Sequence, residues 1–219
     1  MVFDELLNLL LPTNCAICKR IGAPVCPNCT ELFPAAPRST WRGELKGLAV
    51  CDYGEQSIKL IRAFKEFGQT SVGKFMAPQM AALLAGQTGH LVAVPSSRVN
   101  QIKRGYSPAL LLARRVANSA GIPVIDALRF SRAVADQAGL GVDARRQNLE
   151  GSMTAGRGVN GKRVILVDDV VTTGATLLEA ARAVTSAGGE VVGFLTFSET
   201  LLKIDHEYLK TRTKNSKWV

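Results

Sequence analysis

The most informative stretch of this sequence is Val164-Ile165-Leu166-Val167-Asp168-Asp169-Val170-Val171-Thr172-Thr173-Gly174-Ala175-Thr176. Its first four residues are apolar and mostly β-branched, which is typical of a strand buried on both faces. Two carboxylates follow at the exposed end of that strand, and Gly174 permits a tight turn before a helix begins. The stretch therefore predicts a strand, a polar turn and a helix in immediate succession.

The turn suits a phosphate group. Backbone N–H groups at a helix start bind phosphate, and Thr172, Thr173 and Thr176 add hydroxyl groups. The two carboxylates would repel a bare phosphate, so they favour ribose hydroxyls or hydrated Mg²⁺ as neighbours. The alternative is simple helix capping, which explains one Asp or one Thr better than this whole run. The run also lacks the lysine and the spacing of a nucleotide P-loop.

Elsewhere the chain alternates between strand and helix patterns. Strands are expected at 47–53, 91–95, 122–125, 164–167 and 190–197, and helices at 57–67, 75–85, 108–120 and 176–187. This alternation predicts an α/β fold with a mostly parallel sheet and helices on both faces. In such sheets a ligand lies at the carboxyl ends of the strands, where the turns 95–98 and 168–176 fall. Residues 131–162 are expected to form a long polar connection.

Four of the five cysteines form two C-x-x-C pairs, Cys15 with Cys18 and Cys26 with Cys29. Four thiolates so close together match a structural, tetrahedral Zn²⁺ site without an open position. Redox-active pairs and two disulfides are the alternatives, although an odd cysteine count argues against a disulfide framework. We expect a small zinc-ribbon-like unit over 1–40, rich in proline and loops, before a larger domain over 41–219.

Composition and charge narrow the class of protein. The 219 residues are 47% hydrophobic and 21% charged, which is typical of a globular chain. No apolar run is long enough to cross a membrane, and the amino terminus lacks the basic start of a signal peptide, so a cytoplasmic location is expected. The net charge is +9, and residues 98–163 hold twelve Lys or Arg but four acids. Such a block suits a diphosphate or a nucleic acid, with a solvated basic surface as the alternative.

The stretch at 164–176 resembles the diphosphoribosyl-binding signature of type I phosphoribosyltransferases. The resemblance implies that Asp168 and Asp169 contact the ribose hydroxyls of 5-phosphoribosyl 1-diphosphate, bound with Mg²⁺. The turn that cradles the 5′-phosphate would consist of Thr172, Thr173, Gly174, Ala175 and Thr176, and Val170 would also belong to the ligand-binding residues. A diphosphate loop would consist of Pro95, Ser96, Ser97 and Arg98, and a mobile loop would carry Arg132, Arg145 and Arg146.

Further motifs narrow the resemblance to the ComF-type competence proteins over nearly the whole chain. They are the two cysteine pairs, Phe64-Lys65-Glu66-Phe67-Gly68, Arg104-Gly105-Tyr106-Ser107, and the spacing of Gln137, Leu140, Arg145 and Asn148. Tyr106-Ser107 stands where this family usually has Phe-Asn, so no function is carried over to Ser107. The family does not indicate which acceptor is used.

Three functions follow from these patterns. The first is a glycosyltransferase that moves a phosphoribosyl group to or from a base or amine, with phosphoribosyl diphosphate or a nucleoside monophosphate as partner. Arg98 and Arg104 are then expected to neutralise the leaving diphosphate. The second, which the resemblance to the competence proteins implies, is a non-catalytic sensor or adaptor that keeps the phosphoribosyl site, acts in DNA uptake and binds single-stranded DNA or competence proteins. The third is a nucleic-acid-binding module, although the few aromatic residues give little support for stacking on single-stranded DNA.

Overall fold

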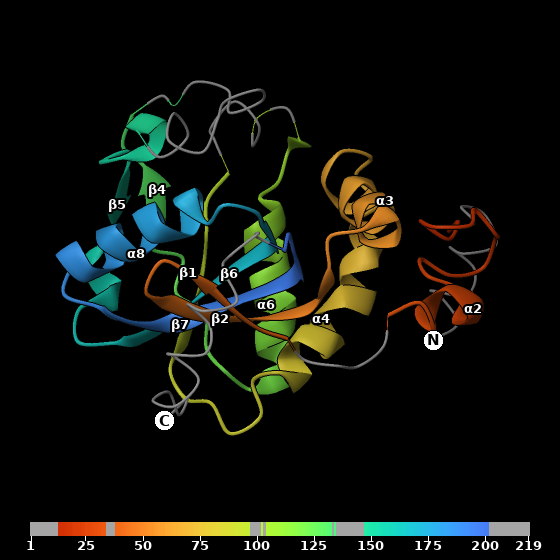
Figure 1. Cartoon of the computed structure of the whole chain (residues 1–219), viewed down its shortest axis with the longest axis horizontal. Coiled ribbons are helices and arrows are strands. Elements are labelled where there is room, and N and C mark those ends of the chain that lie inside the picture. The colour runs from red at the N-terminus through yellow and green to blue at the C-terminus, as the bar shows by residue number, and fades with distance from the viewer. Residues whose placement is uncertain are drawn as a thin grey trace.

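A five-stranded sheet forms the centre of the chain (Figure 1). The computed structural model describes residues 13–33, 38–96, 102, 104–132, 134 and 147–201. The strand order is β1-β2-β7-β6-β3, with β1 antiparallel to β2 and the other pairs parallel. The strands are β1 (Arg38–Arg42), β2 (Leu45–Asp52), β3 (His90–Ala93), β6 (Arg163–Val171) and β7 (Glu190–Glu199). The expected mostly parallel α/β sheet is therefore confirmed.

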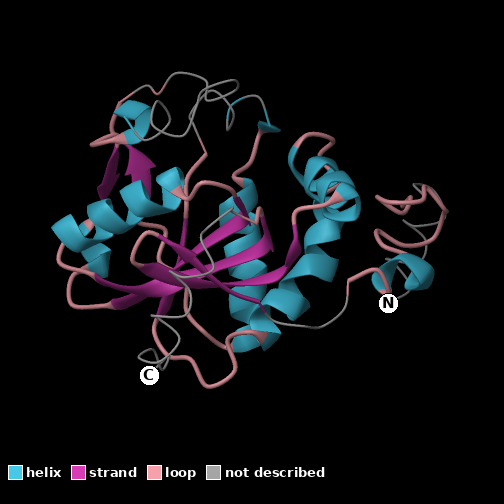
Figure 2. Cartoon of the chain, viewed as in Figure 1, coloured by secondary structure: helices cyan, strands magenta, loops and turns pink. Residues whose placement is uncertain are grey.

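Helices cover both faces of this sheet (Figure 2). One face carries α3 (Glu55–Lys65), α4 (Gly73–Ala82) and α6 (Pro108–Ala120), and the other carries α8 (Ala175–Ser186). As expected, Pro108 opens α6, and Gly121 ends it in the left-handed conformation at φ 70°. Short elements complete the order: α2 (Pro27–Thr30), η1 (Thr70–Val72) and η2 (Arg157–Val159). Among the described helices, none is both long and apolar enough to cross a membrane.

The central strands have a core on each side, which explains their unbroken apolar runs. In β6, Ile165 and Val167 pack with α3, α4 and α6, whereas Val164 and Leu166 pack with α8. Successive side chains of a strand point to opposite faces, so both sets must be apolar when both faces are covered. The same alternation sends Asp168 and Asp169 to opposite faces of the sheet.

Two parts of the fold differ from the sequence-based expectation. Strand β1 lies where only a loop-rich unit and a linker were expected, and β4 (Leu128–Phe130) pairs with β5 (Met153–Ala155) across the expected long connection. These strands are short and contain few consecutive apolar residues, so the periodicity of the sequence does not predict them. Conversely, the strand expected at 122–125 is reduced to one bridge between Val124 and Leu91.

The amino-terminal cysteine unit packs directly on the larger domain. Cys15 and Cys26 belong to the same buried cluster as helices α3, α4 and α6. The Phe33 ring lies 5.4 Å from the Phe75 ring and 5.6 Å from the Phe197 ring, measured between centroids. The two parts therefore share one hydrophobic core. The domain boundary near residue 40 stays a prediction.

Candidate functional site

The acid pair, Asp168 and Asp169, lies in the last third of β6. The strand does not end before the pair, as the sequence suggested, but continues to Val171 alongside β7. Asp168 is half-buried and faces α8, whereas Asp169 is fully buried and faces α3. The main-chain N–H of Asp169 donates to Oδ1 of Asp168 at 2.9 Å. The two neighbouring carboxylates thus lie in different surroundings, Asp168 partly in solvent and Asp169 inside the fold.

Burial of these two carboxylates has an electrostatic cost. Burial, followed by the nearby charge of Asp169, raises the pKa of Asp168 to about 7. Asp169 is compensated instead by a cation, because Nζ of Lys65 lies 2.6 Å from its Oδ1. Burial alone would lower the pKa of Lys65, but Asp169 and then Asp168 outweigh it, so the pKa is raised.

Sequence reasoning did not assign this role to Lys65. The residue is the last of α3 and was quoted only as part of a family motif. A signal was present, because Lys65 lies four residues after Ile61 and therefore beside the apolar face of its helix. A lysine in that position often extends along buried surface with its charged end directed elsewhere.

The threonine turn (residues 172–176) connects β6 to α8. Gly174 precedes the first residue of α8 and has φ 83°, a conformation that favours glycine. The main-chain N–H of Ala175 donates to Oγ1 of Thr173 at 3.4 Å. The turn lines a concavity of about 40 Å³ together with Asp168, Val170, Val171 and Leu177. Hydroxyls, the start of a helix and one carboxylate are thus gathered at one small opening.

Arg42 of β1 is hydrogen-bonded to this turn. It is 2% exposed, and its Nε donates to the carbonyl of Thr172 at 2.6 Å while Nη2 donates to the carbonyl of Thr200 at 2.8 Å. Glu199 supplies the counter-charge at 3.6 Å. A Cβ on Gly174 would lie 2.5 Å from Cβ of Arg42, so glycine is required by contact as well as by φ. The sequence pattern did not indicate that Arg42 would support this turn. It lies at the beginning of the expected second domain, far from residues 172–176 in the sequence.

The expected diphosphate loop begins at the same edge of the sheet. Strand β3 pairs with β6, and the main-chain N–H of Val94 donates to the carbonyl of Val167 at 2.9 Å. Pro95 and Ser96 therefore follow β3 beside the acid pair. Pro95 also lines a second concavity of about 140 Å³ with Ala93, Ser107, Leu110, Asp126, Leu128 and Arg129. Ser97 and Arg98 lie outside the described residues, whereas Arg104 is described and half-buried.

Arg132 lies at the base of the expected mobile loop. Its Nη2 donates to the carbonyls of Asn148 at 2.9 Å and Glu150 at 3.0 Å. These two hydrogen bonds connect Arg132 to residues 148 and 150, which follow the expected mobile loop in the sequence. Arg145 and Arg146 lie outside the described residues.

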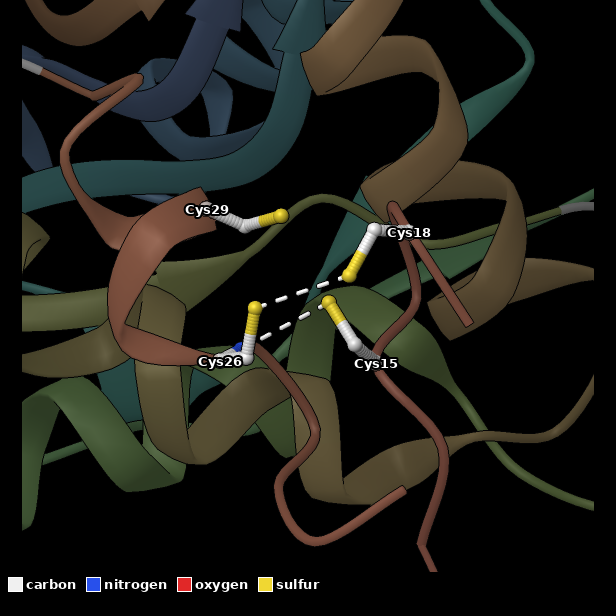
Figure 3. A group of neighbouring side chains, drawn as sticks. All are labelled: Cys15, Cys18, Cys26 and Cys29. Carbon is white, nitrogen blue, oxygen red and sulfur yellow. Dashed lines mark hydrogen bonds between the residues drawn. The ribbon is translucent and has the colours of Figure 1, made fainter. Parts of the chain in front are cut away.

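The four cysteines form a compact cluster (Figure 3). Their sulfur atoms lie within 4.8 Å of one another and point toward a common centre, with 3.5 Å between the Sγ atoms of Cys18 and Cys26. All four are free thiols. Zn–S bonds of about 2.3 Å in a tetrahedron place the sulfurs about 3.8 Å apart, so the donor set fits a structural Zn²⁺.

Thiol acidity in the cluster is uneven. Burial would raise the pKa of Cys15, but hydrogen bonds from main-chain groups of Cys18, Cys26 and Ile17 outweigh it and lower the pKa to about 6. Burial, followed by contacts with the neighbouring thiols, raises the pKa of Cys29 to about 12. A cation at the centre would stabilise all four thiolates.

Comparison with known sequences assigns the domain. The phosphoribosyl transferase domain family matches residues 103–217, a span that includes the acid pair and the threonine turn. The chain belongs to the phosphoribosyltransferase family. Within it, Competence protein F of Haemophilus influenzae is 30% identical over 179 residues, which cover 76% of this chain and 75% of that protein. The expected resemblance to ComF-type competence proteins is therefore confirmed.

A second relative and a solved structure are also similar to this chain. DNA utilization protein YhgH of Salmonella typhimurium is 26% identical over 207 residues, covering 85% of this chain and 90% of the relative. Among solved structures, adenine phosphoribosyltransferase of Thermoanaerobacter pseudethanolicus is 18% identical with a TM-score of 0.43, covering 84% of this chain and 92% of that one. That last similarity is too low to add to the assignment.

Proposed function

We propose that this chain binds 5-phosphoribosyl 1-diphosphate with Mg²⁺ at the carboxyl ends of β6 and β3, and transfers the phosphoribosyl group to or from an acceptor. The observation that carries the proposal is the concavity shared by Asp168 and the threonine turn at the start of α8. A carboxylate for hydroxyl groups and a helix start for a phosphate are the two features that a ribose 5-phosphate unit requires.

Different residues would bind the ribose, the 5-phosphate and the diphosphate of the ligand. Asp168 would accept hydrogen bonds from the 2- and 3-hydroxyls of the ribose, with the buried Asp169 next to it in the strand, and the hydroxyls of Thr172, Thr173 and Thr176 would donate to the 5-phosphate. Asp168 lines the concavity beside the threonine turn, so its carboxylate is within reach of a ligand there. Pro95 and Ser96 lie at the neighbouring strand end, where the diphosphate of an extended ligand would fall.

The proposed reaction exchanges two bonds at C1 of the ribose. The bond from C1 to the diphosphate oxygen breaks with its electron pair, while a lone pair on the acceptor nitrogen forms the new bond. Positive charge develops on the sugar and negative charge on the leaving group. Mg²⁺, when bound, would neutralise the diphosphate. From this chain, the guanidinium of Arg104 would neutralise part of the negative charge on the diphosphate. The carboxylate of Asp168 would stabilise the positive charge on the sugar.

A second candidate function is a non-catalytic ligand sensor or adaptor in DNA uptake. It is favoured by the names of the two relatives, a competence protein and a DNA utilization protein. Such a protein would keep the phosphoribosyl site without turnover and would bind single-stranded DNA or competence proteins elsewhere. Retention of bound phosphoribosyl diphosphate without consumption, across a panel of bases and amines, would favour this candidate.

Ligand-dependent melting tests the first proposal. Phosphoribosyl diphosphate with Mg²⁺ should stabilise the protein by about 2.7 kcal/mol at 100 times Kd. Asp168→Asn with Asp169→Asn should abolish that stabilisation, because the ribose contacts are lost. The control is Glu31→Gln with Glu55→Gln, which removes two exposed carboxylates away from the acid pair. An equal melting shift in both double variants would contradict the proposed site.

A further inference from the structure

Lys65 occupies an unusual place for a lysine. Its Nζ reaches the fully buried carboxylate of Asp169 at 2.6 Å, and its side chain is only 26% exposed. The two residues come from different elements, the end of α3 and the last third of β6. A lysine carries a strongly hydrated charge, so its burial beside a carboxylate is unfavourable unless the pairing is well fixed.

The end of α3 is held firmly on the side of the site. The hydroxyl of Tyr106 donates to the main-chain carbonyl of Phe64, the residue before Lys65. Beyond the helix, the main-chain N–H of Gln69 donates to the carbonyl of Ala63 at 3.0 Å. Phe64 itself is fully buried in the core. Lys65 therefore extends from a rigid support, which is what a positioning role requires.

Tyr106 also connects a second segment of the chain to the end of α3. It stands where ComF-type proteins usually carry phenylalanine, and its hydroxyl makes the bond to Phe64. The Arg104-Gly105-Tyr106 segment is thereby joined to the end of α3. Arg104 also lies near enough to lower the pKa of Lys65, while Asp169 and Asp168 raise it. The charges of Arg104, Asp169 and Asp168 thus all act on Lys65.

The charge balance explains why a third partner is needed. Without a partner, the buried carboxylate of Asp169 would add a negative charge beside a ligand that is itself an anion. Lys65 neutralises that charge, so that the approach of a phosphate to the adjoining turn is less unfavourable. Its attachment to Oδ1 also limits the rotation of the Asp169 carboxylate.

We propose that Lys65 is a positioning residue of the ribose subsite, which holds the Asp169 carboxylate in place and cancels one charge of the acid pair. The inference rests on the proposed function, since it names how that site tolerates an anionic sugar phosphate. Lys65 acts through Asp169 and does not itself contact the ligand. The consequence is that removal of Lys65 matters only while Asp169 is a carboxylate.

The test uses the full chain and two probes, ribose 5-phosphate and inorganic pyrophosphate with Mg²⁺, with binding measured by calorimetry. Lys65→Met should weaken ribose 5-phosphate binding about tenfold or more, because an uncompensated carboxylate remains at the site. It should weaken pyrophosphate binding less. Lys59→Met is the matched control: Lys59 lies on the same helix and pairs with Glu55 at the same 2.6 Å distance, but in solvent. Its binding should equal that of wild type.

A double-variant cycle separates positioning from direct contact. In the Asp169→Asn background, Lys65→Met should cause no further loss of ribose 5-phosphate binding. This double variant also protects the test against misfolding, because it leaves no unpaired buried charge. An additive loss in the cycle, or unchanged binding by Lys65→Met alone, would overturn the inference while leaving the ligand site intact. Failure of wild type to bind either probe would overturn the proposed function and this role with it.

Discussion

The protonation of Asp168 depends on its burial in the fold. Burial and the neighbouring Asp169 raise its pKa from the ordinary 3.8 to about 7 in the folded chain. The folded state therefore binds more protons than the unfolded state between these two values. Stability falls as pH rises through that window, because deprotonation is less favourable in the folded chain.

This pKa predicts the behaviour of one variant. Asp168→Asn has no proton to lose at this position, so it should lose less stability than wild type between about pH 4 and pH 8. Thermal or urea unfolding of both ligand-free proteins across this range measures the difference. Parallel stability curves for the two proteins would show that Asp168 titrates normally.

Residues such as Arg42 and Lys65 show what one-dimensional patterns miss. Arg42 is almost fully buried and bonds to Thr172, 130 positions later in the chain. A charged side chain is expected at the surface unless a counter-charge is known, and the counter-charge of Arg42 is the distant Glu199. By contrast, the acid pair and the threonine turn are contiguous, so their placement beside one another needed no tertiary information.

The unit of β6, turn and α8 is the element on which the site depends. The turn is fixed on one side by the left-handed Gly174 and on the other by the buried guanidinium of Arg42. Arg42 has little freedom to withdraw, because main-chain carbonyls of Trp41, Thr172 and Thr200 hold it. Any side chain at position 174 must therefore displace the turn itself.

Gly174→Ala tests this element. It should destabilise the protein by about 1–2 kcal/mol from the backbone conformation and by about 1–3 kcal/mol more from overlap with Arg42. Gly121→Ala is the matched control, since Gly121 has φ 70° and no neighbour within 4 Å of an added Cβ. Chemical unfolding compares the two variants. Equal losses would mean that the contact with Arg42 contributes nothing.

At the scale of the whole molecule, the cysteine unit belongs to the main core. Phe33 contacts both Phe75 of α4 and Phe197 of β7, so loosening of the unit must affect the sheet. A structural metal bound only in the folded state would therefore stabilise the entire chain rather than a separate appendage.

Cys18→Ser tests this coupling. Cys18 is the exposed member of the cluster, so its change leaves the apolar packing intact and removes one expected metal ligand. We expect loss of about one Zn²⁺ per chain and a single unfolding transition that is lower by roughly 5 °C or more. Elemental analysis and calorimetry give the two results, with Cys51→Ser as the control that retains metal. Two separate transitions in wild type, or no bound metal, would contradict the prediction.

The sequence by itself determined those features whose information is local. The alternation of strands and helices, the acid pair with its threonine turn, and the two cysteine pairs each lie within a short window, where periodicity and spacing are directly readable. Only the tertiary structure decided the rest. Strand β1, the β4–β5 pair, and the positions of Arg42 and Lys65 depend on partners distant in the chain. Their energies come from burial and pairing across the fold, so a charged or weakly patterned residue acquires its role only when that partner arrives beside it.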